Sequence, residues 1–384
     1  MNSATTDIRL PDDFPAAEKS ELNIGYIPLL DCIPVVAAKE LGFFEEAGLS
    51  VTLSRESSWA SIRDKVQYGL LDAAPMPAGI VLASAMRLGA SQPMVTAMGL
   101  GLNGNAITVS NTLWEAINPS NIALNSEQAA LALKSYLEGF EGTLNVASVH
   151  TYSTHHFLLR EWLQHFDIDP QGKLKLIVVP PPQMVDAMQR GVIDIFCVGE
   201  PWNSLAQAKG VGHKLLSGHQ IWENAPDKVL GVTKAWSESN PATHQRLIAA
   251  LLKACSWLDN ETNKLSGFAL LLNNDYIPID DIDSINLLFG QHSFTPPIAT
   301  FPWLSQARWF SQHILNVSDH NQAPESLDNI VEQTYLTSLY REVASALDIN
   351  LPCENTKDEG VHAGNWEIAG THHPIVMPSD IRFR

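Results

Sequence analysis

Cysteine and basic residues are scarce in this chain, and each scarcity narrows the classes of protein to consider. Four cysteines occur among the 384 residues, far apart in the sequence and without a CxxC pair. This usage indicates reduced, mostly structural cysteines. The 24 lysines and arginines stand against 42 aspartates and glutamates, which gives a formal net charge of −18 at pH 7. Long-range repulsion from such a charge disfavours general binding to nucleic acid or to anionic membranes.

Long apolar runs, an export signal and enzyme motifs are also missing. Proline, glycine or charge interrupts the longest apolar stretches, so none reaches membrane-spanning length. The first 30 residues show no basic region followed by an apolar one, and no lipoprotein-type cysteine follows them. GxSxG, HExxH, P-loop and clustered Cys/His patterns are absent. We therefore expect a cytoplasmic binding protein with no catalytic residues, no cofactor and no metal.

Strand and helix signals alternate along the first half of the chain. Residues 22–57 predict a strand, a loop, a short helix, a glycine turn and a second strand. A helix from Trp59, a short buried strand and a helix at or after Pro77 follow, and residues 93–110 predict strands around a Gly/Asn turn. Alternating units of this kind predict a parallel or mixed sheet with helices on both faces.

The same order of signals occurs twice. The stretches "QYGLLDAAPM" at 67–76 and "QRGVIDIFCV" at 189–198 both join a helix, a glycine turn that ends in aspartate and a buried strand. Two related α/β lobes explain this repeat, and convergence on one helix–glycine–strand pattern is the alternative. The length of 384 residues, 45% of them hydrophobic, is enough for two cores.

A histidine pair opens a predicted helix in "YSTHHFLLREWL", residues 152–163. Ser153 or Thr154 is the expected N-cap, which puts His155 and His156 in the first turn. Neighbouring helix positions diverge by about 100°, so the two rings cannot chelate one ion together. First-turn N–H groups and the helix dipole favour an anion beside one imidazole, whereas a solvated cap is the alternative.

Six stretches in order carry a resemblance to a known family: "GYIPLLDCIPVVAAKELGFFEEAGLSVTL", "SWASIRDKVQYGLLDAAPMPAG", "GLNGNAITVS", "THHFLLREWL", "VGEPWN" and "PDKVLGVTKAWSESNP". Over roughly residues 20–330 the chain resembles the nitrate- and bicarbonate-binding proteins of ABC uptake systems. Within that group it is most similar to NasS-like cytoplasmic nitrate/nitrite sensors, which pair with a NasT-like RNA-binding (ANTAR) antiterminator. The other functions that the resemblance allows are a substrate-binding component of an ABC nitrate/nitrite transporter and a thiamine-pyrimidine-synthase-like enzyme.

The resemblance implies an α/β, two-lobed periplasmic-binding-protein-like fold of type II, with the ligand cleft between the lobes. The expected divisions are a flexible N-terminal segment (1–20), lobe I (21–112 and 225–350), lobe II (113–224) and an irregular C-terminal tail (351–384).

The resemblance also implies where the anion binds. The family's ligand-contacting positions fall on Trp59, Asn105, His155 and Lys228. Relatives often have Gln at Asn105 and Asn at His156. The bicarbonate-binding relatives carry an acidic residue that works with calcium where this chain has Lys228, so a lysine favours nitrate or nitrite without metal.

Gly79 and Pro201 complete the predicted ligand-binding residues, whereas Glu200 is expected not to touch the ligand. Gly79 lies near the start of a helix whose backbone N–H groups can face an anion. Pro201 is expected to shape the cleft wall. Glu200 would repel an anion, so we expect it to pair with a cation or a polar group.

Overall fold

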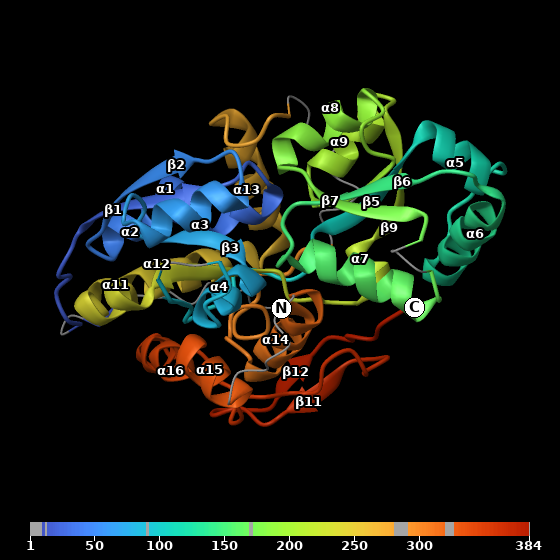
Figure 1. Cartoon of the computed structure of the whole chain (residues 1–384). Helices are drawn as coiled ribbons and strands as arrows, with labels where there is room; N and C mark the ends of the chain where they lie inside the picture. Colours follow the sequence, from blue (N-terminus) through green and yellow to red (C-terminus); the bar gives the residue numbers. More distant parts are fainter. Residues whose placement is uncertain are drawn as a thin grey trace.

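Two α/β lobes lie side by side with a C-terminal region beneath both, as Figure 1 shows. The computed structural model describes residues 10–11, 14–89, 92–168, 172–279, 291–318 and 326–383. We define lobe I as the described residues of 14–102 and 226–279, lobe II as those of 105–223, and the C-terminal region as those from 291 onward. The two-lobed, mixed α/β architecture expected from the sequence is confirmed.

Lobe I is built on a sheet in the strand order β2-β1-β3-β10-β4. Strands β1 and β2 are parallel, β3 joins β1 through a parallel bridge between Ile24 and Ala73, and β10 runs antiparallel to β3 and β4. The strands are β1 (Glu21–Tyr26), β2 (Ser50–Arg55), β3 (Ala74–Pro77), β4 (Met94–Val95) and β10 (Lys228–Thr233).

Lobe II repeats this topology in the order β7-β6-β8-β5-β9. Strands β7, β6 and β8 are parallel, and β5 runs antiparallel to β8 and β9. The strands are β5 (Asn105–Ser110), β6 (Leu144–Ser148), β7 (Leu174–Val178), β8 (Ile195–Gly199) and β9 (Gly212–Ser217). Equal strand order and direction in both lobes confirm the structural repeat that the sequence predicted.

The aspartate of each glycine–aspartate turn accepts a hydrogen bond from the backbone of a neighbouring strand. The carboxylate of Asp72 accepts a hydrogen bond from the backbone N–H of Asn23 (2.9 Å), at the start of β1. The carboxylate of Asp194 accepts one from the backbone N–H of Asn145 (2.8 Å), at the start of β6. Asp72 thus fixes the start of β3 beside β1, and Asp194 fixes the start of β8 beside β6, because each carboxylate satisfies a backbone donor of the neighbouring strand.

Helices cover both sheets (Figure 1). Those of lobe I are α1 (Ile33–Glu40), α2 (Phe43–Glu46), α3 (Trp59–Gln67), α4 (Ala78–Ala85), α11 (Lys234–Ser239), α12 (Pro241–Leu258) and α13 (Glu261–Asn273), with the 3₁₀ turn η1 (Leu30–Cys32) after β1. Those of lobe II are α5 (Asn111–Ile117), α6 (Ser126–Gly139), α7 (Thr154–His165), α8 (Met184–Gln189), α9 (Trp202–Ala208) and α10 (Gly218–Ile221), with the 3₁₀ turn η2 (Pro181–Gln183). In the part of the chain that the structure describes, no helix is both long and apolar enough to cross a membrane.

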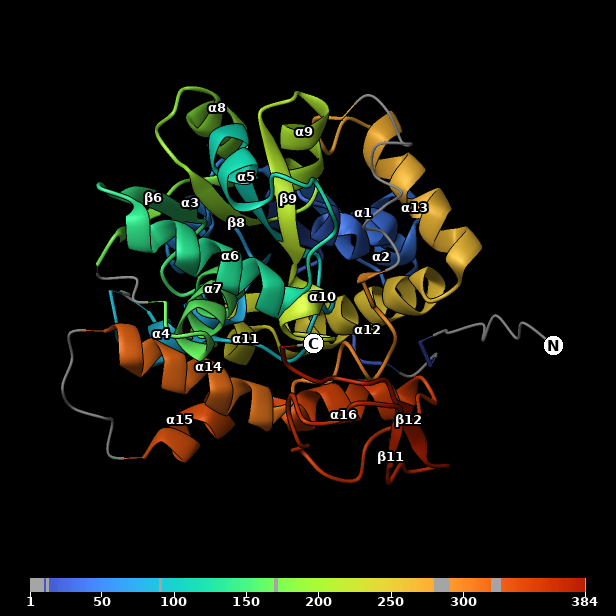
Figure 2. The same ribbon diagram turned by 90° about the vertical axis from the view of Figure 1, so that its right-hand side faces the viewer.

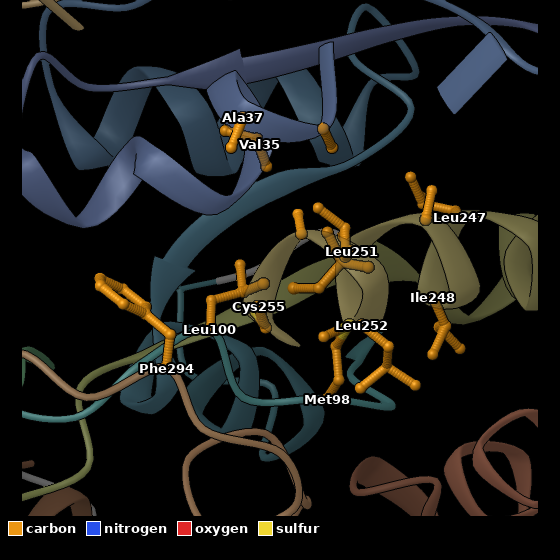
Figure 3. Packing of buried hydrophobic residues seen from close by; sticks show 14 of the residues in the cluster. Val35, Ala37, Met98, Leu100, Leu247, Ile248, Leu251, Leu252, Cys255 and Phe294 are labelled. Carbon is orange, nitrogen blue, oxygen red and sulfur yellow. The ribbon is translucent and has the colours of Figure 1, made fainter. Parts of the chain in front are cut away.

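The core of lobe I forms where α12 packs on α1 and on the strand segment that follows β4. Figure 3 shows Cys255 of α12 beside Leu100, with Leu251 farther along α12 and Val35 and Ala37 of α1 above them, and all five belong to one buried cluster. The five side chains are at most 1% exposed. Burial of a leucine or valine side chain contributes about 1.5–3 kcal/mol to folding, so this contact holds α12 firmly in lobe I.

Two crossover segments connect the lobes and run side by side. The backbone N–H of Asn103 donates to the carbonyl oxygen of Ala225 (2.9 Å), and Leu102 forms an antiparallel bridge with Pro226. The predicted boundary of lobe I at residue 112 is therefore wrong by one strand, since β5 pairs with β8 and β9 of lobe II. The Gly/Asn turn before β5 is a crossover and does not join two paired strands. The alternation of signals in the sequence could not show this, because it carries no information on strand partners.

The C-terminal region packs against both lobes, as Figure 2 shows. It contains α14 (Leu304–Val317), α15 (Leu327–Thr334), α16 (Thr337–Ala346) and the paired strands β11 (Trp366–Ile368) and β12 (Ile375–Met377). Ile375 and Met377 are buried in the lobe I core. The backbone N–H of Phe383 donates to the carbonyl oxygen of Ile221 in lobe II (2.7 Å). Over most of 351–383 the tail is irregular apart from β11 and β12, and apolar and backbone partners on both lobes hold it in place.

Residues 14–20, which the sequence placed in a flexible N-terminal segment, pack on the rest of lobe I. The carboxylate of Glu18 accepts hydrogen bonds from the backbone N–H groups of Ala242 (3.1 Å) and Thr243 (2.8 Å) in the first turn of α12. A carboxylate is favourable there because first-turn donors lack intrahelical partners. Residues 1–9, 12 and 13 lie outside the described residues.

Candidate functional site

Lys228 lies between two carboxylates where the lobes meet. It is the first residue of β10, directly after the second crossover, and is 1% exposed. Its Nζ is 2.9 Å from Oδ2 of Asp31 and 2.5 Å from Oδ2 of Asp227. Asp31 comes from η1, so the fold joins positions almost 200 residues apart. We call Asp31, Lys228 and Asp227 the buried triad.

The buried triad holds a charged lysine. Burial alone would lower the pKa of Lys228, but the two carboxylates outweigh it and the pKa is raised. Burial raises the pKa of Asp227, although Lys228 opposes the shift. With both carboxylates ionised the triad carries a net charge of −1, so Lys228 does not present an uncompensated positive charge to a ligand.

Trp59 covers the triad from lobe I. It is the first residue of α3, and its helix start is fixed by Ser58, whose hydroxyl accepts from the backbone N–H of Ser61. The Nζ of Lys228 lies 5.3 Å from the centroid of the Trp59 ring, a cation–π distance. Within the described chain the indole N–H of Trp59 is buried and has no acceptor.

The two histidines of α7 have different environments. Ser153 is the N-cap, and its hydroxyl accepts from the backbone N–H of His156. The Nδ1 of His156 is 3.0 Å from the hydroxyl oxygen of Ser148, whereas neither ring nitrogen of His155 has a partner among the residues described. Burial and the nearby Lys228 hold the pKa of His155 well below its ordinary value, so its ring is neutral. The expected divergence of the two rings is confirmed, and only His155 adjoins the triad.

Asn105 and Thr154 add polar groups from lobe II. Asn105 opens β5 opposite Gly199 of β8. A methyl group on Gly199 would lie 3.6 Å from both Oδ2 of Asp31 and Nε2 of His155, so Asn105 flanks the point where the lobes touch. The side-chain amide of Asn105 is buried without a partner in the described structure. The Thr154 hydroxyl is close enough to Asp227 to lower its pKa, yet it makes no hydrogen bond of normal geometry to a described residue.

The other predicted positions shape this contact. Gly79 is in the first turn of α4, where a Cβ would lie 2.4 Å from the carbonyl oxygen of Tyr152 in lobe II. Pro201 is the N-cap of α9 and follows Glu200 through a cis peptide bond. Glu200 has the polar partner that we expected, since its carboxylate accepts from the backbone N–H of Ser204 (3.1 Å).

The lobes are closed around this cluster. The backbone N–H of Leu30 in lobe I donates to the carbonyl oxygen of Glu200 in lobe II (2.8 Å). Apolar side chains of both lobes, including Leu29 and Val198, belong to one buried cluster. The structure therefore shows a conformation in which the site is shielded from water.

Several buried donors without acceptors converge on one place. Among the described residues, the indole of Trp59 supplies one N–H donor, neutral His155 supplies one, the Thr154 hydroxyl one and the Asn105 amide two. The other ring nitrogen of His155, the amide oxygen of Asn105 and Oδ1 of Asp227 are buried acceptors that also lack a partner there. Buried polar groups in proteins are normally hydrogen-bonded, so a cluster of unpaired groups in which donors outnumber acceptors indicates a ligand. Groups of three or more His, Cys, Asp or Glu side chains suited to a metal are not found in the described ranges.

Sequence reasoning missed Asp31, Asp227 and Thr154. Asp227 directly precedes Lys228 and Thr154 directly precedes His155, so their positions next to predicted site residues could have identified both. For Asp31 the signal was its position in the loop after the first strand, where parallel sheets place ligand-binding groups.

Comparisons with known proteins agree with the fold. The chain is 42% identical over 378 residues to the nitrate import ATP-binding protein NrtC of Synechocystis sp. (strain ATCC 27184 / PCC 6803 / Kazusa), covering 94% of this chain and 53% of that protein. It is 29% identical over 363 residues to the nitrate/nitrite binding protein NrtA of the same organism, covering 87% of this chain and 78% of that protein. The chain spans about half the length of the ATP-binding relatives that it matches.

The crystal structure of the periplasmic nitrate-binding protein NrtA from Synechocystis PCC 6803 is similar at a TM-score of 0.78 and 24% identity, covering 91% of this chain and 94% of that one. Residues 15–271, more than half of the chain, match the NMT1-like family. With the two-lobed fold and the matched range together, the chain belongs to the NMT1-like family.

Proposed function

We propose that this chain binds one nitrate or nitrite ion between its lobes, without turnover, and acts as a cytoplasmic sensor of that ion. The observation that carries the proposal is the set of buried, unpaired donors on Trp59, Asn105, Thr154 and His155 around the charged Lys228. The names of the NrtC and NrtA relatives, which refer to nitrate or nitrite, support the choice of ligand.

The chemistry of nitrate fits these donors. The ion is planar, monovalent and weakly basic, so it is best held by several donors spread around its plane with a cation nearby. The donors come from α3 in lobe I and from β5 and α7 in lobe II. Because both lobes supply donors, an anion between them stabilises the closed conformation.

The partner in the sensor proposal is a NasT-like RNA-binding (ANTAR) antiterminator. A ligand shifts an equilibrium only by its differential affinity for two states, and open and closed lobes provide such states. In this proposal the open form holds the antiterminator and nitrate-driven closure releases it. The large surplus of acidic residues suits attraction to a basic RNA-binding face.

A role within an ABC nitrate/nitrite transporter is the second candidate. The relative that is 42% identical is named as an ATP-binding protein of nitrate import, and the chain corresponds to about half of it. The same anion-dependent closure would then act on an ATP-binding transport subunit. Both candidates share the binding site and differ in the partner.

Calorimetric titration tests the ligand. Nitrate or nitrite should bind at one site per chain in buffer containing EDTA, while bicarbonate and an alkanesulfonate should bind far more weakly. Binding of bicarbonate alone, or binding that needs calcium, would refute the nitrate assignment.

Gel filtration with a purified partner tests the role. An ANTAR antiterminator should co-elute with the chain in sulfate buffer and separate in nitrate buffer of equal ionic strength. Rising salt should also weaken the complex, because exposed charges are screened within about 8–10 Å at moderate ionic strength. Nitrate-dependent co-elution with an ATP-binding transport subunit, and none with the antiterminator, would favour the second candidate.

A further inference from the structure

With both carboxylates ionised, the net negative charge of the buried triad would repel a bound anion. Lys228 contributes +1 and the carboxylates of Asp31 and Asp227 contribute −1 each, which leaves −1 beside the unpaired donors. A bound nitrate would bring the total to −2 in a site where Lys228 is 1% and Asp227 3% exposed. Like charges in a desolvated site repel strongly and are normally neutralised by protonation.

We propose that nitrate binding is coupled to the uptake of one proton, which the carboxylate of Asp227 receives. The proton comes from the solvent and forms an O–H bond on Asp227, and no bond of the ion changes. The triad then carries no net charge, and the complete site with nitrate carries −1. This inference rests on the proposed function, since it concerns how the same site accepts its ligand.

The surroundings of Asp227 make it the acceptor of that proton. One of its oxygens faces Lys228, and the other, Oδ1, is buried without a hydrogen-bond partner in the described part of the chain. A proton on Oδ1 therefore breaks no hydrogen bond of normal geometry and turns an unsatisfied acceptor into a donor, which the nearby Thr154 hydroxyl oxygen can accept. Asp31 keeps its 2.9 Å contact with Lys228 and is more exposed than Asp227. Burial already raises the pKa of Asp227, which favours protonation of this carboxylate.

The titratable groups that face Asp227 come from four other elements or positions of the fold. Lys228 on β10 stays charged because its pKa is raised. His155 on α7 stays neutral because burial and Lys228 lower its pKa. Cys197 on β8 stays a thiol because burial raises its pKa. Asp31 on η1 remains paired with Lys228. Nitrate itself remains ionised at neutral pH, so the coupled proton is left to Asp227.

Proton uptake on binding makes the nitrate affinity fall as the pH rises. At pH below the pKa of Asp227 in the free protein, the group is already protonated and nitrate binds without proton uptake. As the pH rises above that value, each binding event must also capture a proton, and affinity falls. For one coupled proton the nitrate affinity falls by up to tenfold per pH unit, until the pH exceeds the pKa of Asp227 in the nitrate-bound protein.

Calorimetry in buffers of different ionisation enthalpy measures the coupled proton directly in the unaltered protein. At pH 7.5, the heat of nitrate binding should change with buffer identity in proportion to an uptake approaching one proton per ion. From pH 6 to pH 8 the affinity should fall by about 10- to 100-fold at constant ionic strength. Nitrate binding with no buffer dependence and no pH dependence would overturn the proton coupling while leaving the proposed function intact. No binding of nitrate or nitrite at any pH would refute the proposed function itself.

Two matched variants locate the proton. Asp227→Asn mimics the protonated carboxyl, so its nitrate affinity should vary less than threefold from pH 6 to pH 8 and should exceed that of the unaltered protein at pH 8. Glu359→Gln removes another carboxylate whose pKa burial raises, one that accepts from the Ser305 hydroxyl (2.8 Å) in the C-terminal region outside the triad, and should keep the full pH dependence. Circular dichroism checks that both variants are folded. Loss of the pH dependence in Glu359→Gln, or its persistence in Asp227→Asn, would overturn the assignment to Asp227.

Discussion

Replacing Lys228 by methionine is the most informative perturbation of this protein. Methionine keeps the length of an unbranched side chain but removes the charge that holds Asp31 and Asp227 together. Removal of one partner from a buried ion pair costs about 3–5 kcal/mol of folding free energy, since the remaining charge is left uncompensated. Lys228 is 1% exposed, so solvent does not screen this loss.

Nitrate binding should fall by a comparable amount. Loss of the cation from a desolvated binding site costs about 2–5 kcal/mol, which corresponds to roughly 30- to 4,000-fold in affinity. Urea unfolding monitored by tryptophan fluorescence gives the change in stability, and nitrate titration gives the change in affinity. The stability of Lys228→Met should rise as the pH falls, because the carboxylates left without the lysine bind protons more tightly in the folded state.

A double variant separates the two roles of Lys228. Lys228→Met/Asp227→Asn removes one carboxylate together with the lysine, so part of the lost stability should return, while nitrate binding stays weak because the cation is still missing. An unchanged urea midpoint in Lys228→Met would refute the buried triad. Nitrate affinity equal to that of the unaltered protein in either variant would remove Lys228 from the ligand site.

Three further predictions concern the surrounding groups. His155→Ala should weaken nitrate binding by about 1–3 kcal/mol, whereas His156→Ala should mainly lower stability, because only the second ring has a hydrogen-bond partner among the described residues; equal losses of affinity would contradict this. Gly79→Ala places a methyl group 2.4 Å from a carbonyl oxygen of lobe II, so it should hold the lobes apart and weaken nitrate binding by about 1–3 kcal/mol, with a larger radius of gyration in X-ray scattering. Arg382→Ala removes a guanidinium whose carbon lies 4.1 Å from the centroid of the Trp222 ring, so the free energy of unfolding should fall by about 1–3 kcal/mol. Arg190→Ala breaks an exposed ion pair with Asp186 and should change this free energy by less than about 1 kcal/mol. Equal effects of the two variants would show that the C-terminal residues do not stabilise lobe II.

The local elements of this protein follow from its sequence. Helix starts at Trp59 and at Thr154 depend on a cap and a few following residues, and both were predicted within one position. The repeated glycine–aspartate turn predicted two similar lobes, because its backbone geometry and its hydrogen bond to the first strand involve short stretches of chain. The resemblance to nitrate-binding relatives added the positions of Trp59, Asn105, His155 and Lys228, but not their environment.

Only the tertiary structure decided which elements pair and what surrounds the proposed ligand. Strand β5 continues a run that looks like part of lobe I, yet its partners are β8 and β9, and a periodic pattern contains no record of partners. The C-terminal residues lack periodicity and are ordered by groups on both lobes. The resemblance placed Lys228 at the ligand site as a positive charge for the anion, and packing gives this lysine two carboxylates, one from a loop almost 200 residues away. The charge of a site is a sum over groups that only long-range folding brings together, so sequence alone determined which residues were candidates, and the fold determined their chemistry.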